Sequence, residues 1–234
     1  MRLIKHFDFV NEPFLDKNDW TIATGEKWAN HEVQQYVDDP ENLFFDNGLN
    51  LRATYQDGIV RSARIHTKDK FYFKYGKIDI IAKVPSGKGT WPALWMMPQA
   101  SVYGGWPKSG EIDIMEHVGN KPNTIYTCIH TERYNHRRDE QYYKIHVGEA
   151  IPDNFHTFSL RWEKERITYY VDHQEVSHYI KGEDGKDTGP QGWPFDEDFY
   201  LIINLAIGGS LGGEVDYASF PQTFVVKDIK VYQE

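Results

Sequence analysis

Short apolar runs separated by Gly, Pro, Asn and Asp are the feature of this sequence that most restricts its fold. No stretch keeps the spacing of an amphipathic helix over three turns. Turn signals at 46–48, 87–89, 104–105 and 208–209 leave intervals too short for the crossover helices that parallel strands require. The sequence therefore predicts an all-β protein, an antiparallel sandwich or jelly roll. The expected strands are 71–73, 77–84, 111–116, 125–130, 157–162, 167–171, 200–205 and 224–232.

The charge of the chain and the length of its apolar runs argue against several kinds of partner. The 234 residues include 26 Lys and Arg against 35 Asp and Glu, and the net charge is −9. Binding to nucleic acid, which requires basic groups that neutralise phosphates, is not expected. The longest apolar runs, such as 200–207 with Asn204 inside it, fall far short of the roughly 20 residues of a membrane span. We expect one domain over residues 1–234, acting as a monomer without membrane contact.

The cysteine content and the N-terminal segment bear on the compartment. The single cysteine, Cys128, excludes an internal disulfide framework and a four-thiolate zinc site. Asp8 and Glu12 stand where a signal peptide would have its apolar stretch, so we see no export signal. This suits an intracellular protein or an exported one whose signal has been removed.

Aromatic residues are numerous, with 7 Trp, 15 Tyr and 13 Phe. They suit β-strands, where large flat side chains pack well. They also suit a groove whose rings stack on sugar faces or on another planar partner. The composition leaves both interpretations open.

Three acids in the segment 109–119 (SGEIDIMEHVG) are the strongest chemical signal in the chain. On a strand, residues two apart share a face, so Glu111 and Asp113 point the same way. Glu116 has the opposite parity. A β-bulge around Ile114 and Met115 adds one residue and predicts all three acids on one face.

Clustered carboxylates repel one another and need a reason. An exposed polar face is one interpretation, and a calcium site is another, although calcium sites usually draw on loops with carbonyl ligands. Glycoside hydrolysis fits best, because it needs one carboxylate as nucleophile and one carboxylic acid as proton donor, and a third acid can tune their protonation.

The segment 111–116 (EIDIME) resembles the active-site strand of glycoside hydrolase family 16, in the bulged form found in laminarinases, agarases and carrageenases. Other segments are similar to the laminarinase branch and follow the order of that family. They are 28–36 (WANHEVQQY), 40–42 (PEN), 89–98 (GTWPALWMMP), 103–107 (YGGWP), 193–196 (WPFD) and 205–209 (LAIGG).

The resemblance implies a concanavalin A-like β-jelly roll of two antiparallel sheets, whose concave face forms an open cleft for β-1,3-glucan. It implies Glu111 as nucleophile, Glu116 as general acid and base, and Asp113 as their hydrogen-bonded partner. Expected substrate-binding residues match sugar-contacting positions or flank turns beside the acid strand. They are Asn30, Arg64, Trp91, Trp95, Trp106 and His130.

A structural calcium ion is a further expectation. Asn47, Gly48 and Asp228 resemble the calcium site on the convex side of this fold, with the carbonyls of Pro13 and Gly48 joining Asp228. An ordinary hairpin turn and an exposed aspartate explain the same residues. The ion would stabilise the fold, and no cofactor is expected for the chemistry.

Two alternatives of function stay open. Binding modules of the same superfamily recognise β-glucan without cutting it, but they typically lack the two glutamates that are present here. Within the enzymes, β-1,3-1,4-glucan, agarose or carrageenan could be the substrate. The segment 131–140 (TERYNHRRDE) is more charged than the family pattern, which leaves the preference of the neighbouring subsites open.

Overall fold

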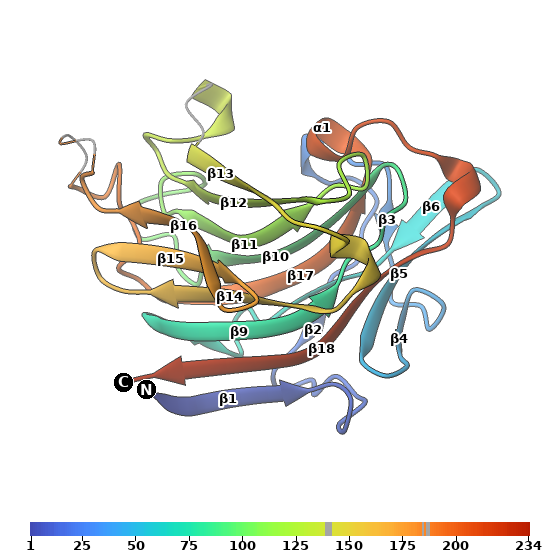
Figure 1. Cartoon of the computed structure of the whole chain (residues 1–234), viewed down its shortest axis with the longest axis horizontal. Helices are drawn as coiled ribbons and strands as arrows, with labels where there is room; N and C mark the ends of the chain where they lie inside the picture. The colour runs from blue at the N-terminus through green and yellow to red at the C-terminus, as the bar shows by residue number, and fades with distance from the viewer. Residues whose placement is uncertain (139–141, 184, 186–187) are drawn as a thin grey trace.

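The computed structural model describes the whole chain except residues 139–141, 184 and 186–187, and it consists of two curved β-sheets packed face to face (Figure 1). The first sheet has the order β16-β15-β14-β9-β18-β5-β6-β3, with β1 beside β18 and β4 beside β5. Its strands are β1 (Arg2–Asp8), β3 (Gln35–Tyr36), β4 (Leu43–Phe45), β5 (Leu49–Gln56), β6 (Ile59–Ser62), β9 (Gly76–Lys83), β14 (His156–Trp162), β15 (Arg166–Val171), β16 (Gln174–Ile180) and β18 (Gln222–Gln233).

The second sheet has the order β13-β12-β11-β10-β17-β7-β2, and β8 pairs with β17. Its strands are β2 (Thr21–Ile22), β7 (Arg64–His66), β8 (Tyr72–Phe73), β10 (Thr90–Pro98), β11 (Glu111–His117), β12 (Thr124–His130), β13 (Tyr142–Val147) and β17 (Phe199–Ile207). The strand pairs of the described chain are antiparallel apart from β3 and β6, which run parallel. The predicted all-β sandwich is therefore confirmed, with that one parallel pair as an addition.

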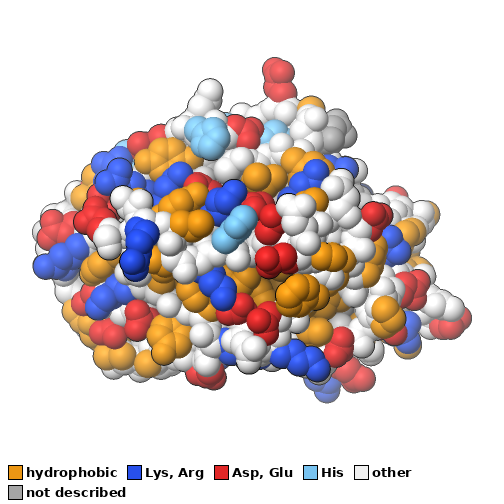
Figure 2. Space-filling view, turned by 90° about the horizontal axis from the view of Figure 1, so that it is seen from below, with side chains coloured by type: hydrophobic (Ala, Val, Ile, Leu, Met, Phe, Trp, Pro, Cys, Tyr) orange, Lys and Arg blue, Asp and Glu red, His pale blue; other side chains and the backbone are white. Residues whose placement is uncertain are grey.

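Helical structure in the described chain is limited to short turns. The elements are α1 (Gly209–Gly212) and four 3₁₀ turns: η1 (Ala29–His31), η2 (His136–Arg138), η3 (Ile151–Asp153) and η4 (Tyr217–Ser219). Within the described residues, no helix is long and apolar enough to cross a membrane. On the face drawn in Figure 2, basic and acidic side chains are interspersed, so that face lacks the basic patch that nucleic acid requires.

The predicted strands are all present, with ends that differ by a few residues. Strand β10 was not predicted, although it lies between β11 and β17 in the sheet. Pro92 and Pro98 explain the omission, because proline lacks the backbone N–H that a central strand normally donates. The twelve residues of β18 include the register shift between Val226 and Asp228 that bends it along the first sheet.

The core lies between the sheets and determines which side chains face outward. Leu94 and Met96 of β10 and Ile112 of β11 are fully buried in it, and Ile78 and Ile80 of β9 belong to the same cluster from the first sheet. Since side chains alternate along a strand, the neighbours of these residues project from the outer face of the second sheet. That outer face carries the candidate site.

Candidate active site

The predicted bulge is present in β11. Against β10, Trp95 lies opposite Asp113 and Leu94 lies opposite Met115, so Ile114 is the additional residue. The pairing with β12 shifts at the same place, between Asp113 and Glu116. The additional residue restores the parity of Glu116 and brings it to the side of the sheet that Asp113 faces.

A cavity of about 220 Å³ lies over this face of the second sheet. Glu111, Asp113 and Glu116 line it together. The predicted substrate-binding residues Asn30, Arg64, Trp91 and Trp95 line it as well. Trp106 and His130 are adjacent through contacts with the carboxylates described below. The structure thus brings together every predicted catalytic and substrate-binding residue.

Glu111 lies at one end of the row of acids and is held by two neighbours. The indole Nε1 of Trp106 donates a hydrogen bond to Oε2 at 2.6 Å. His130 Nε2 lies 3.8 Å from Oε1. The side chain is 16% exposed, so one part of the carboxylate faces the cavity. An ionised, oriented carboxylate with an open side is suited to nucleophilic attack.

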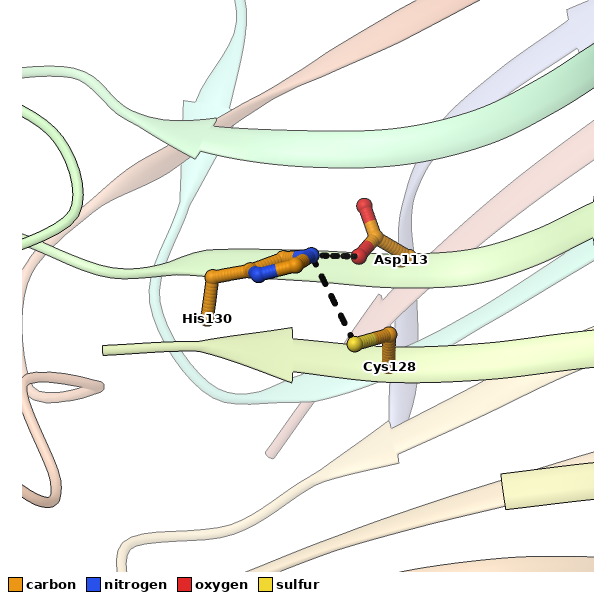
Figure 3. Close-up of side chains that lie close together, drawn as sticks. All are labelled: Asp113, Cys128 and His130. Atoms are coloured by element: carbon orange, nitrogen blue, oxygen red, sulfur yellow. Dashed lines mark hydrogen bonds and ion pairs between the residues drawn. The ribbon is translucent and has the colours of Figure 1, made fainter. Parts of the chain in front are cut away.

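Asp113 and His130 form a buried pair in the middle of the site. Burial raises the pKa of Asp113, and the negative charges of Glu111 and Glu116 raise it further. His130 Nε2 lies 3.2 Å from Oδ2 of Asp113 (Figure 3). Burial by itself lowers the pKa of His130, but Glu111 and Asp113 outweigh it and raise that pKa well above its usual value. The pair therefore retains protons between the two glutamates at neutral pH.

Glu116 has a drier environment than Glu111. Burial raises its pKa to about 7, although Trp91 Nε1 donates a hydrogen bond to Oε1 at 2.8 Å and opposes that shift. A carboxyl group with a pKa near the working pH can give up and take back a proton during one reaction cycle. Glu116 thus has the properties of a general acid and base.

The opposite wall of the cavity contains residues that sequence reasoning missed. Trp95 Nε1 donates to Asn204 Oδ1 at 2.7 Å, and Asn204 Nδ2 donates to Tyr36 OH at 3.0 Å. The Arg64 guanidinium lies 4.8 Å from the ring centre of Trp28 and 4.9 Å from that of Trp95.

Glu32 is a fourth carboxylate in this cavity, and burial raises its pKa. Gln34 Nε2 donates to its Oε2 at 2.8 Å. Trp28, Glu32 and Tyr36 belong to the motif at 28–36, which was the available signal for them. The signal for Asn204 was its position as the polar residue inside the apolar run 200–207.

A family model described as "Glycosyl hydrolases family 16" matches residues 25–214. The chain belongs to glycosyl hydrolase family 16. Its sequence is 38% identical to the beta-glucanase of Rhodothermus marinus over 241 residues, which cover 97% of this chain and 82% of that protein.

Solved structures support the same placement. The laminarinase from Flavobacterium sp. UMI-01 matches with a TM-score of 0.92 and 37% identity, covering 99% of this chain and 100% of that one. SCLam, a non-specific endo-β-1,3(4)-glucanase of family 16, matches with a TM-score of 0.90 and 34% identity over 100% of this chain and 95% of that one. A mutant of SCLam was co-crystallized with 1,3-β-D-cellotriosyl-glucose. The predicted family and its concanavalin A-like jelly roll are therefore confirmed.

The charged segment that departs from the family 16 pattern reaches the cleft. The ring of His136 lies 5.1 Å from that of Trp106, and the guanidinium of Arg137 lies 4.6 Å from the same ring. Trp106 in turn binds Glu111. The segment 131–138 thus borders the Glu111 end of the site, while residues 139 and 140 lie outside the described part of the chain.

The predicted calcium ligands have other partners. His6 Nε2 lies 2.6 Å from Asp228 Oδ2, and Lys230 Nζ lies 3.1 Å from Oδ1. The Gly48 carbonyl accepts hydrogen bonds from Asp46 N and Asn50 Nδ2, both at 3.0 Å. Calcium requires six to eight oxygen ligands, so these residues do not fit the ion as they are arranged. A calcium ion held by Pro13, Gly48 and Asp228 stays a prediction, and binding there would require Lys230 and His6 to leave the carboxylate.

Proposed function

We propose that this family 16 glycoside hydrolase is an endo-acting, retaining β-1,3-glucanase of the laminarinase kind. The observation that carries the proposal is the bulged strand β11, which presents two glutamates in different environments to one cavity. Family membership and the relatives named as laminarinases support the substrate. The non-specific activity stated for SCLam makes mixed-linkage glucan the main competing substrate.

The proposed mechanism is a double displacement. The Glu111 carboxylate attacks the anomeric carbon while Glu116 donates its proton to the departing glycosidic oxygen, which leaves a glycosyl ester on Glu111. Glu116, now ionised, then takes a proton from water, and the resulting hydroxide equivalent releases the sugar with its original configuration. Asp113 and His130 keep a balanced charge between the two glutamates, which limits their mutual repulsion.

The cavity wall supports sugar binding in several ways. Trp95 and Trp91 offer indole rings beside the acids, and both rings are fixed by hydrogen bonds from Nε1. Arg64 lies against Trp95 and supplies donors for sugar hydroxyls. A fixed aromatic surface loses little conformational entropy when a sugar stacks on it.

The test is a set of reducing-sugar assays on laminarin, lichenan, agarose and carrageenan, with the product sizes followed over time. We expect laminarin to be cut to a range of oligomers from the earliest times. Proton NMR should show the β-anomer as the first product. Initial release of glucose alone would contradict endo action, activity on galactans alone would contradict the substrate, and an initial α-anomer would contradict retention.

The variant Glu111→Gln tests the assignment of the nucleophile. We expect kcat to fall by several orders of magnitude, because the covalent step is removed, while binding of laminarin oligomers persists. The matched control is Glu32→Gln, which neutralises another carboxylate of the same cavity. A similar loss in both variants would show that the cavity needs negative charge in general and would contradict the special role of Glu111.

A further inference from the structure

Strands β11 and β12 place four chemically active side chains in a block. In their register, Glu111 lies opposite His130 and Asp113 lies opposite Cys128. Residues two apart on a strand share a face, and side chains directly opposite in an antiparallel pair have Cβ atoms about 4.5–5.5 Å apart. The block therefore presents two carboxylates, an imidazole and a thiol to one another.

The atoms of three of these residues converge on a point (Figure 3). Cys128 Sγ lies 3.5 Å from His130 Nε2, and that nitrogen lies 3.2 Å from Asp113 Oδ2. All three ligand atoms lie within 4.8 Å of one another. Asp113 is 3% exposed, and its Oδ2 is buried without a hydrogen-bond donor in hydrogen-bonding geometry. A buried carboxylate oxygen directed at an imidazole and a thiol is typical of an unfilled ligand set.

We propose that Asp113, Cys128 and His130 bind a thiophilic divalent cation of the Zn²⁺ class, and that the bound ion inhibits glycoside hydrolysis. Nothing in the established membership of family 16 assigns a metal to these residues. The inhibitory part rests on the proposed function, whereas the binding part does not.

The ligand types and their spacing both suit this ion. Zinc bonds to sulfur at about 2.3 Å and to nitrogen or oxygen at about 2.0–2.2 Å, so a tetrahedral ion separates its ligand atoms by roughly 3.3–3.6 Å. The measured 3.2 and 3.5 Å are close to that range. Thiolate and imidazole select zinc-like ions over calcium and magnesium, which take oxygen ligands. Glu111 Oε1, 3.8 Å from His130 Nε2, is placed to approach as a fourth ligand.

Binding exchanges protons for the metal without any redox step. The Cys128 thiol and the His130 Nε2–H each lose a proton to solvent as the metal–sulfur and metal–nitrogen bonds form. Burial raises the pKa of Cys128 to about 12, so the thiol is protonated before the ion arrives. The affinity should therefore increase with pH. Asp113 lines the cavity, so the ion would enter from the substrate cleft.

Inhibition follows from the position of the ion. It would withdraw Asp113 from its place between the glutamates and put a positive charge beside Glu111. The nucleophilicity of that carboxylate would fall, and the charge balance that keeps a proton on Glu116 would change.

Cobalt(II) is the direct probe of binding, because its bond to a thiolate produces a charge-transfer absorption in the near ultraviolet. We expect this absorption in the wild type and its loss in Cys128→Ser. We also expect the zinc concentration that halves laminarin hydrolysis to rise at least about tenfold in Cys128→Ser, relative to the zinc-free rate of that variant. Cys128→Ala repeats both measurements if the serine variant does not fold, as judged by circular dichroism.

The matched control is His6→Gln, which alters the surface group of His6, Asp8 and Asp228, a second cluster with metal-ligand spacing but without a thiol. Both readouts should be unchanged in it. Absence of the cobalt–thiolate absorption in the wild type would overturn the binding site. Equal zinc inhibition of the wild type and Cys128→Ser, with the absorption present, would overturn the inhibitory part alone. Because the spectrum requires no substrate, failure on laminarin would concern the proposed function and not this site.

Discussion

The hydrogen bond from Trp91 to Glu116 should set the pH at which hydrolysis declines. Burial raises the pKa of Glu116 to about 7, and the indole N–H opposes that rise by stabilising the carboxylate. Glu116 acts in its protonated form in the proposed mechanism, so kcat/KM falls as the pH increases through this pKa. Trp91→Phe keeps an aromatic ring but removes the donor. The pKa should increase further, and activity should persist to higher pH.

The size of the shift follows from the hydrogen bond itself. A hydrogen bond to a charged group contributes about 1.5–3 kcal/mol, whereas one to a neutral group contributes about 0.5–1.5 kcal/mol. The difference of about 1–1.5 kcal/mol is what the ionised form of Glu116 loses relative to the protonated form. Since one pKa unit corresponds to about 1.36 kcal/mol, the alkaline limb should move upward by about one pH unit.

The measurement is kcat/KM on laminarin oligomers as a function of pH, which reports the ionisations of the free enzyme. The control is Trp95→Phe, which removes an equally short indole hydrogen bond, to Asn204 at 2.7 Å, from the same cavity. Both variants should lose some affinity for sugar, but the control should leave the limb in place. A limb that is unmoved in Trp91→Phe, or that moves equally in the control, would refute the reasoning.

Three other outcomes are expected. Glu116→Ala should lose most activity on laminarin but retain a larger fraction on an aryl glycoside whose leaving group needs no proton, and equal losses on the two substrates in steady-state kinetics would argue against its role as acid. Arg64→Lys should increase KM by about 3–10-fold with little change in kcat, because the stacking of the planar guanidinium between Trp28 and Trp95 is lost; a fall in kcat alone would count against this. Leu94→Ala should lower the free energy of unfolding by about 2–5 kcal/mol in urea denaturation, since the side chain is fully buried, and a change below about 1 kcal/mol would contradict tight packing there.

The fold class and most of the site could be predicted because their signals are local. Alternation along 111–116 showed which acids share a face, and the break in parity at Glu116 located the bulge. What could not be predicted depends on contacts between distant segments. The bond from Trp95 to Asn204 joins residues 109 positions apart, and no periodicity indicates it.

The register of β11 against β12 belongs to the same category. It decides that Cys128 lies opposite Asp113, and the sequence alone assigned this cysteine no partner. The contacts of Asp228 with His6 and Lys230 likewise depend on the side-by-side placement of β1 and β18, the first and last strands of the chain (Figure 1). Turn residues at 46–48 could suggest an ion site, but they could not show which cations already occupy the carboxylate.

The bulge also explains how two identical side chains obtain different chemistry. On a regular strand Glu116 would point toward the core, where Leu94 and Met115 are fully buried, and a carboxyl group there would have no partner. The additional residue turns Glu116 outward, under Trp91 and away from His130's contact with Glu111. Glu111 thus stays near a cation, which favours its ionised form, whereas Glu116 stays buried, which favours its protonated form. A single inserted residue therefore separates the nucleophile from the acid in the proposed mechanism.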